Sequence, residues 1–539
     1  GTANVAVGYG ALDANTTADN NTAVGQGSLS ASTTAAQCTA IGTSSLAGVT
    51  TASDNTGLGV NAGSAITTGV HNTCVGRNGG SGITTGTNNV TLGNFTINGV
   101  ATGASNIAVG YAALNALTSG SGNIAMGRNA CLAMTTASNT IAIGYEALKV
   151  EDTESNLVAV GTQALYSNNG GIRNTAIGHG AMFYNVSGGS NTACGYLALH
   201  NSTGDGNTAF GNDALRSNTS AEKNTALGNE ALEANTTGHS NTAVGHHSLT
   251  ANTTATENCA VGFETMQSVT TGVANTGVGA GALRACTTGE TNTAVGRNAL
   301  YDLSTSDEAT AVGSSAGENA VGTRNTFLGF IAGKGATSGC NGENNVAIGH
   351  SALYQMTSAT NNTIVGRDAG SDLTTGSNNL FLGNGAGTSA SPNGIHITDS
   401  NRIVFGNNNI TDAHIKVSIQ ATSDQRDKAD ITDFTKGLDI VNALRPVTYK
   451  WDMRSDYSSD LSTTPDGTHK SNKTEIGLIA QEVETVEKAN GYSTNENNRL
   501  FIGKSTDGLY YGLKYERLVP VLINAIKELS AKVTALEAA

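Results

Sequence analysis

Short apolar stretches alternate with polar, turn-rich stretches at a fixed interval along the first 383 residues. The string NTAVG or a close variant recurs 23 times, and 19 of the 22 intervals between its closing glycines are 17 residues long. The residue before this glycine is apolar in all 23 copies, and the residue four after it is apolar in 17 copies and glycine in six. A repeat of fixed length predicts a solenoid in which each copy forms one coil.

The apolar stretches are too short for helices, and Thr, Val and Gly are poor helix formers. We therefore expect two short strands per coil, joined by Asn/Gly turns, with about two large apolar side chains pointing inward. Such an interior is thin, which predicts a flattened roll that oligomerises, several rolls sharing an axis. The residue four before the glycine is Asn in 19 copies. It is expected either to stack into an amide ladder or to supply a turn conformation, and the sequence leaves both open.

The pattern changes after about residue 388, and three regions are expected. Residues 1–388 form the repetitive shaft, 389–423 a β-rich neck with alternation at 395–397 and 403–405, and 424–539 a charged domain of ordinary composition. Near the end, apolar residues alternate at spacings of three and four, as on the a/d seam of a coiled-coil helix; they are Val519, Leu522, Ile526, Leu529, Val533 and Leu536. The alternative is an amphipathic helix packed on its own domain.

Composition and charge exclude several classes of protein. The 539 residues carry a net charge of −14, which disfavours partners such as nucleic acid or an anionic membrane. No apolar run reaches the length of a membrane span. The seven cysteines form no CxxC pair, and the histidines at 179, 246, 247 and 350 fall on turns, so no metal or cofactor is expected. The chain starts at Gly1 without a signal peptide, so we expect a fragment or a processed chain.

Two parts of the chain resemble known families. NTAVG followed by an AL step resembles the NSVAIG-type head repeats of trimeric autotransporter adhesins and the repetitive shafts of phage tail fibres, over roughly residues 1–385. This resemblance implies a trimer of parallel β-rolls. The expected fold class is thus mainly β: a trimeric parallel β-roll or β-solenoid of 17-residue repeats, followed by a small α+β domain that ends in a coiled-coil helix.

Four blocks near the C-terminus resemble the intramolecular chaperone auto-processing domain of phage endosialidases, tail spikes and tail fibres. They are SDQRDKADI at 423–431, LRPVTYKW at 444–451, IGLIAQEVE at 476–484 and YYGLKYERLVPVLINAIKEL at 510–529. The resemblance implies a domain that trimerises the fibre, helps its stem to fold and then cuts itself off after a serine. Such a domain would act once, as a single-turnover protease.

The family's S-D-x-R-x-K motif corresponds to Ser423, Asp424, Arg426 and Lys428. The resemblance implies that Ser423 is the nucleophile and precedes the scissile bond, and that Asp424 and Arg426 have positioning roles. A serine hydroxyl needs a base, and Lys428 can act as one where an apolar site keeps its amine uncharged. Cleavage would release residues 424–539 from a fibre of residues 1–423.

The expected function is a structural and adhesive fibre of a phage tail. Its expected partners are two further copies in a homotrimer, other tail proteins, and a host cell-surface glycan or protein, with no nucleic acid and no membrane insertion. It would be made in the host cytoplasm and act outside the cell as part of the virion tail. The alternatives are a bacterial trimeric surface adhesin, a glycan depolymerase using acids such as Glu146, Glu230 and Asp368, and ice binding by ranks of Thr.

Overall fold

The computed structural model describes the chain except residues 152, 337–338, 392–396, 411, 417–418, 420, 455–456, 458–462 and 505–510. The predicted alternation at 395–397 therefore falls mostly outside the described residues. The chain forms two compact units, Gly1–Phe330 with Thr337–Asn341, and Ile331–Ala336 with Gly342–Ala539. Among the described residues, no helix combines the length and the apolar character needed to cross a bilayer.

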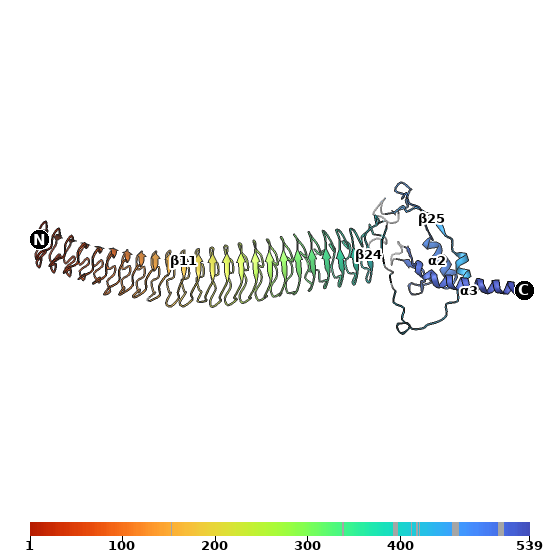
Figure 1. Cartoon of the computed structure of the whole chain (residues 1–539), viewed down its shortest axis with the longest axis horizontal. Helices are drawn as coiled ribbons and strands as arrows, with labels where there is room; N and C mark the ends of the chain where they lie inside the picture. Colours follow the sequence, from red (N-terminus) through yellow and green to blue (C-terminus); the bar gives the residue numbers. More distant parts are fainter. Residues whose placement is uncertain are drawn as a thin grey trace. The chain divides into compact units, whose positions relative to one another are not determined.

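The first unit is built from three-residue strands, one in each coil. They are β1 (Val5–Val7), β2 (Thr22–Val24), β3 (Thr39–Ile41), β4 (Thr56–Leu58), β5 (Thr73–Val75), β6 (Val90–Leu92), β7 (Ile107–Val109), β8 (Ile124–Met126), β9 (Ile141–Ile143), β10 (Val158–Val160), β11 (Thr175–Ile177), β12 (Thr192–Cys194), β13 (Thr208–Phe210), β14 (Thr225–Leu227), β15 (Thr242–Val244), β16 (Cys259–Val261), β17 (Thr276–Val278), β18 (Thr293–Val295), β19 (Thr310–Val312) and β20 (Thr326–Leu328). Neighbours pair in parallel, so that Thr225 faces Thr242 and Leu227 faces Val244, one 17-residue coil apart (Figure 1). The predicted parallel β-solenoid of 17-residue repeats is confirmed.

The prediction of two strands per coil is wrong, because the described part of each coil holds a single strand. The opposite side is closed by turn residues that still bond from coil to coil: the N–H of Leu215 donates to the carbonyl of Ala231 at 3.0 Å. The residue four after the repeat glycine has a left-handed backbone, with φ of 53° at Leu232 and 61° at Gly317. An L-residue strand cannot contain this conformation, and glycine adopts it freely, which explains why glycine replaces leucine there.

The apolar residue before each repeat glycine points outward, although we expected it to point inward. Phe210 and Leu227 occupy this position, and they are 53% and 46% exposed. In a three-residue strand the central side chain faces opposite to its neighbours, and the small central residue, such as Ala226, is the buried one. The interior is therefore thin, as predicted, but it is filled by the central alanines and by the leucines of the opposite side, such as Leu232. We call the outward-facing set the outer apolar column.

The repeat glycines stack directly on one another through their backbones. A Cβ added to Gly245 would lie 2.2 Å from the carbonyl oxygen of Gly262, in the next coil. The φ of Gly245 is also 134°, a conformation that side chains rarely tolerate. The repeat keeps glycine here because both the space and the backbone angle exclude every other residue.

The recurring asparagines form an amide column inside the solenoid. At Asn241, Nδ2 donates to Oδ1 of Asn224 at 3.2 Å and to the carbonyl of Ala255 at 2.8 Å, while Oδ1 accepts the N–H of Asn258 at 3.0 Å. The left-handed turn conformation belongs to the preceding residue, Ser240, whose φ is 60°. Of the two readings left open by the sequence, the ladder is therefore the one that the structure shows.

A second polar column, which was not among the sequence predictions, lies in the interior, seven residues after the repeat glycine. Its buried members are Glu151, Asn168, Asn185, Ser202, Asn218, Asn235 and Asn252. The same position is apolar in the flanking coils, where it holds the buried Met134 and Val269. In the described part of the column, the amide bonds between coils run towards the N-terminus, so that Asn185 donates to Asn168 at 3.0 Å and Asn168 donates to the carboxyl of Glu151.

The second unit begins with the strands β21 (Val346–Ile348), β22 (Thr363–Val365), β23 (Leu380–Leu382) and β24 (Ile403–Phe405). They pair in parallel, and β24 adds a coil-like strand within the predicted neck, since Leu380 faces Ile403. The rest is the expected small α+β domain. It contains η1 (Gln425–Asp427), α1 (Leu438–Ala443), β25 (Val447–Tyr449), β26 (Glu475–Gly477), α2 (Ala480–Ala489), η3 (Glu496–Asn498), β27 (Ile502–Lys504), β28 (Tyr511–Leu513), η4 (Tyr515–Arg517) and α3 (Leu518–Glu537).

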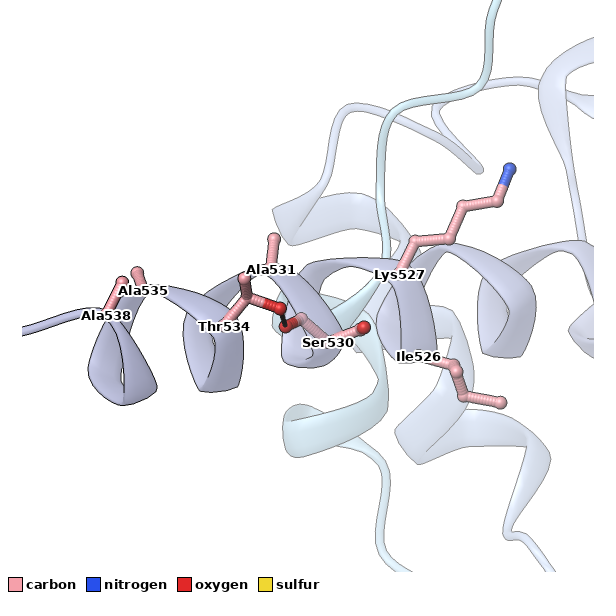
Figure 2. A pocket seen from close by; sticks show the side chains of 7 residues that line it. All are labelled: Ile526, Lys527, Ser530, Ala531, Thr534, Ala535 and Ala538. Carbon is pink, nitrogen blue, oxygen red and sulfur yellow. Dashed lines mark hydrogen bonds between the residues drawn. The ribbon is translucent and has the colours of Figure 1, made fainter.

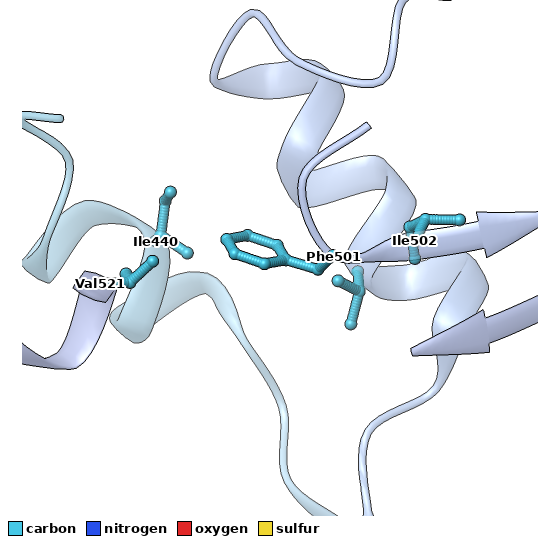
Figure 3. Close-up of a cluster of buried hydrophobic side chains, with 5 residues drawn as sticks. Ile440, Phe501, Ile502 and Val521 are labelled. Atoms are coloured by element: carbon cyan, nitrogen blue, oxygen red, sulfur yellow. The ribbon is translucent and has the colours of Figure 1, made fainter. Parts of the chain in front are cut away.

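One hydrophobic cluster holds the helices of this domain together. Ile440 of α1, Val483 of α2 and Val521 of α3 are buried with Phe501 and Ile502 (Figure 3). Two antiparallel pairs, β25 with β26 and β27 with β28, complete the domain. The C-terminal helix predicted from the a/d spacing is confirmed as α3.

Candidate processing site

A single turn of 3-10 helix brings the four motif residues together. Asp424 caps the N-terminus of η1, its carboxylate accepting the N–H of Arg426 at 2.9 Å, and the N–H of Lys428 donates to the carbonyl of Gln425 at 3.2 Å. The chain therefore folds back between Ser423 and Lys428. Nζ of Lys428 donates to Oγ of Ser423 at 2.6 Å. The spacing of five residues thus places the expected base against the expected nucleophile.

Arg426 holds the carboxylate of Asp424, the residue that follows the expected scissile bond. Its guanidinium reaches Oδ2 at 2.6 Å and Oδ1 at 3.1 Å, which is a forked, charge-assisted contact. The hydrogen bonds from the side chain and the N–H of Arg426 lower the pKa of Asp424, and the same pair raises the pKa of Arg426. Both effects favour the charged pair, which links the residue after the expected scissile bond to the turn of η1.

The motif is open to solvent in the single chain. Ser423, Arg426 and Lys428 are exposed, and Asp424 is half-buried. The apolar surroundings expected around Lys428 are therefore not found in this chain. A general base must accept the proton of the serine hydroxyl, whereas an ammonium group can only donate. The geometry assembles the pair of side chains without supplying the dry environment that would activate it.

Helix α3 forms hydrogen bonds with the chain a few residues beyond the motif. Nδ2 of Asn524 donates to the carbonyl of Phe434, and the N–H of Leu438 donates to a carboxylate oxygen of Glu528 at 3.0 Å. A Cβ on Gly437 would lie 2.4 Å from Glu528 and 2.6 Å from the backbone of α3. The sequence analysis missed both α3 side chains because they are about 90 residues from their partners.

The a/d seam of α3 is exposed rather than packed on its own domain. The exposed fractions of its six residues range from 45% at Val533 to 78% at Leu536. Next to Ile526, a hollow open to solvent runs along the helix, lined by Lys527, Ser530, Ala531, Thr534, Ala535 and Ala538 (Figure 2). Helix α3 does pack on its own domain, through the buried Val521 and Ala525, but with a different face from the seam, so a coiled coil along the seam stays a prediction.

The other candidate residues do not form a second site. The repeat acids pair with bases, as Glu146 does with Lys149, Glu230 with His247 and Asp368 with Arg367. Among the described residues, no three His, Cys, Asp or Glu side chains lie close enough to hold a metal ion. The seven cysteines are all free thiols, and burial raises the pKa of Cys74 to about 11, as expected for an inert filler.

Comparison with known proteins bears on the C-terminal part of the chain. Residues 423–492 match the family described as the chaperone of endosialidase. The match begins at Ser423 and includes the first three of the four sequence blocks, together with η1, α1 and α2. No curated protein and no solved structure matches the chain. The protein is thus a β-solenoid repeat protein with a chaperone-of-endosialidase domain in its C-terminal region.

Proposed function

We propose that this protein is a homotrimeric fibre of a phage tail, folded by its C-terminal domain and then released from it. The outer apolar column is the observation that carries the trimer. It places an apolar side chain on the surface of every repeat coil, and within each compact unit these side chains form a row that single-chain soluble proteins rarely expose. The exposed seam of α3 is a second such surface. Packing three copies along both would bury them.

In the trimer, the processing motif would also gain the apolar surroundings that it lacks in the single chain. Neighbouring chains around Lys428 would remove water and favour its uncharged amine, which can then accept the proton of Ser423. A hydroxyl that attacks the carbonyl of its own residue would close a strained four-membered ring. We therefore place the attacking Oγ on Ser423 of a neighbouring copy.

The reaction is a single hydrolysis of the bond between Ser423 and Asp424. Oγ adds to the carbonyl carbon, the C–N bond breaks, and the nitrogen of Asp424 leaves with a proton from Lys428. Water then hydrolyses the ester, which restores the hydroxyl and leaves a carboxylate on the fibre. The products are residues 1–423 and residues 424–539.

The mass of the protein, measured under native and denaturing conditions, tests both parts of this proposal. We expect a native trimer of residues 1–423 from the wild-type gene, and a full-length chain from the Ser423→Ala variant. A full-length wild-type product would refute the self-cleavage, and a well-folded monomer would refute the trimer. Co-expression of wild-type chains with tagged Ser423→Ala chains tests the attack between copies, because only that route cuts the tagged chains.

A host-surface glycan or protein is the ligand that we propose for the fibre, with the virion tail as its location. The ion pairs of the repeat acids argue against a depolymerase, which needs two carboxylates facing one bond. Binding of the purified trimer to intact host cells, with no release of reducing sugar, is the expected result. Release of sugar would favour the depolymerase instead.

A further inference from the structure

Helix α3 has two faces that make different contacts. The a/d seam, including Ile526 and Leu529, lies in solvent in the single chain. The opposite face is buried at Val521 and Ala525, and it carries Asn524. The helix is therefore joined to its own domain on one side and leaves the other side free for further copies.

The buried side of α3 holds a segment that follows directly from the processing motif. Asn524 binds the carbonyl of Phe434 and, at 3.4 Å, that of Lys436. Glu528 accepts the N–H of Leu438 at 3.0 Å, which satisfies the first N–H of α1 where no side chain caps that helix locally. The approach is so close that only glycine fits at position 437. Two polar side chains thus fix residues 434–438 to α3.

Only a short tether separates this anchor from the motif. Phe434 lies six residues after Lys428, and residues 429–433 have no helix or strand. An extended chain of six residues spans about 20 Å at most. Since the tether is this short, the position of Ser423 and Lys428 follows the position of α3 within that reach.

We propose that Asn524 and Glu528 are positioning residues for cleavage after Ser423. They tie the processing motif to the helix that joins the copies, so assembly of the α3 seams brings the motif of one chain to that of its neighbour. Cleavage therefore takes place only after the copies have assembled, and an unassembled chain keeps its C-terminal chaperone domain. This inference rests on the proposed self-cleavage and adds the two side chains that couple it to the seam.

Time courses of cell-free synthesis test the anchor, with cleavage followed on denaturing gels and oligomers by native mass spectrometry. We expect the double variant Asn524→Ala, Glu528→Ala to form trimers that are cut at least tenfold more slowly than the wild type. Lys527→Ala with Lys532→Ala, which changes two exposed residues of the same helix outside the Asn524 and Glu528 bonds, is the matched control and should be cut at the wild-type rate. Glu528→Gln keeps an oxygen for the Leu438 N–H, so it should restore most of the rate lost in Glu528→Ala.

Several outcomes would overturn the inference. Trimers of the double variant that are cut at the wild-type rate would show that the anchor has no positioning role. If the double variant does not assemble, the single variants decide the question. Cleavage of Glu528→Gln that is as slow as cleavage of Glu528→Ala would refute the role of the hydrogen bond. A monomeric Ile526→Asp chain that is cut normally would refute the coupling to assembly. A wild type that stays whole would instead refute the self-cleavage itself.

Discussion

Removing one amide from the inner column should weaken the shaft by an amount that follows from its hydrogen bonds. In Asn241→Ala, two donated bonds disappear and the buried N–H of Asn258 loses the oxygen that it reaches at 3.0 Å. A lost internal bond costs roughly 1 kcal/mol, and a buried N–H left unpaired costs about 1–3 kcal/mol. The partners are partly protected, since Ala255 keeps its bond from Asn252. We therefore expect a loss of about 3–5 kcal/mol in the free energy of unfolding.

Urea unfolding followed by circular dichroism measures this loss, with all variants made in the Ser423→Ala background so that each sample is one chain. Asn212→Ala is the matched control, because Asn212 is exposed and bonds only at the surface, to Asp213 at 2.6 Å. Its effect should stay within about 0.5 kcal/mol. Unfolding of Asn241→Ala at the same urea concentration as Asn212→Ala would refute a stabilising role for the column.

Asn241→Asp separates the donor from the acceptor. The aspartate keeps an oxygen for the N–H of Asn258 but brings a buried negative charge towards the oxygens of Asn224 and Ala255. We expect it to be less stable than Asn241→Ala at neutral pH and to recover in acid, where the protonated group can donate again. Equal stabilities of Asp and Ala at both pH values would contradict this reading.

Four further changes test other features of the chain. Gly245→Ala places a Cβ 2.2 Å from a backbone oxygen, so thermal melting should show a loss of about 3 kcal/mol or more. Ser44→Gly relaxes a left-handed residue with φ of 54° and should raise stability by up to about 1 kcal/mol in the same assay. Burial raises the pKa of Glu151 above its ordinary value of 4.5. The contribution of this group to the free energy of unfolding is therefore fully present below pH 4.5 and is lost as the pH rises through the higher folded pKa. Glu151→Gln should abolish this pH-dependent contribution in urea titrations at several pH values. Phe501→Ala should cost the C-terminal domain about 3–5 kcal/mol and leave the chain uncut and aggregated, whereas the exposed Ile476→Ala should assemble normally, as size-exclusion chromatography would show.

The coil length and the stacking were readable from the sequence, but the direction of the side chains was not. A fixed spacing of 17 residues allows only coils that repeat with the same shape, and Asn recurring at one position left the amide column as one of two open readings. The outer apolar column was assigned to the interior because apolar side chains are usually buried. That rule fails for Phe210 and Leu227, since the small residue before each of them, Ala209 or Ala226, fills the narrow interior. The left-handed turn at Leu232 had one signal, the glycines that replace leucine at this position in six copies.

The residues of the processing motif could be identified from the sequence alone, whereas their surroundings could be described only once the fold was known. The contact between Ser423 and Lys428 follows from a local turn, so a motif of six residues contains it. The exposure of Lys428 and the bonds of Asn524 depend on parts of the chain far apart in sequence, which no local pattern records. The second polar column could have been found by reading position seven after each glycine, where Met134 gives way to Glu151.

In the second polar column, the side chains donate hydrogen bonds between coils in one direction only. This direction restricts which residue can occupy the first position of the column. Between coils, every amide of the column donates towards the N-terminus. The first member, Glu151, therefore accepts a hydrogen bond from Asn168, and it also accepts the N–H groups of Thr153 and Glu154. A carboxylate accepts at all of these points, while an amide in its place would turn an NH₂ group against another donor. Anyone who shortens or lengthens this shaft by whole coils therefore has to keep the acid together with the turn at 151–154, because an amide set into that turn would face the N–H groups of Thr153 and Glu154 with another donor.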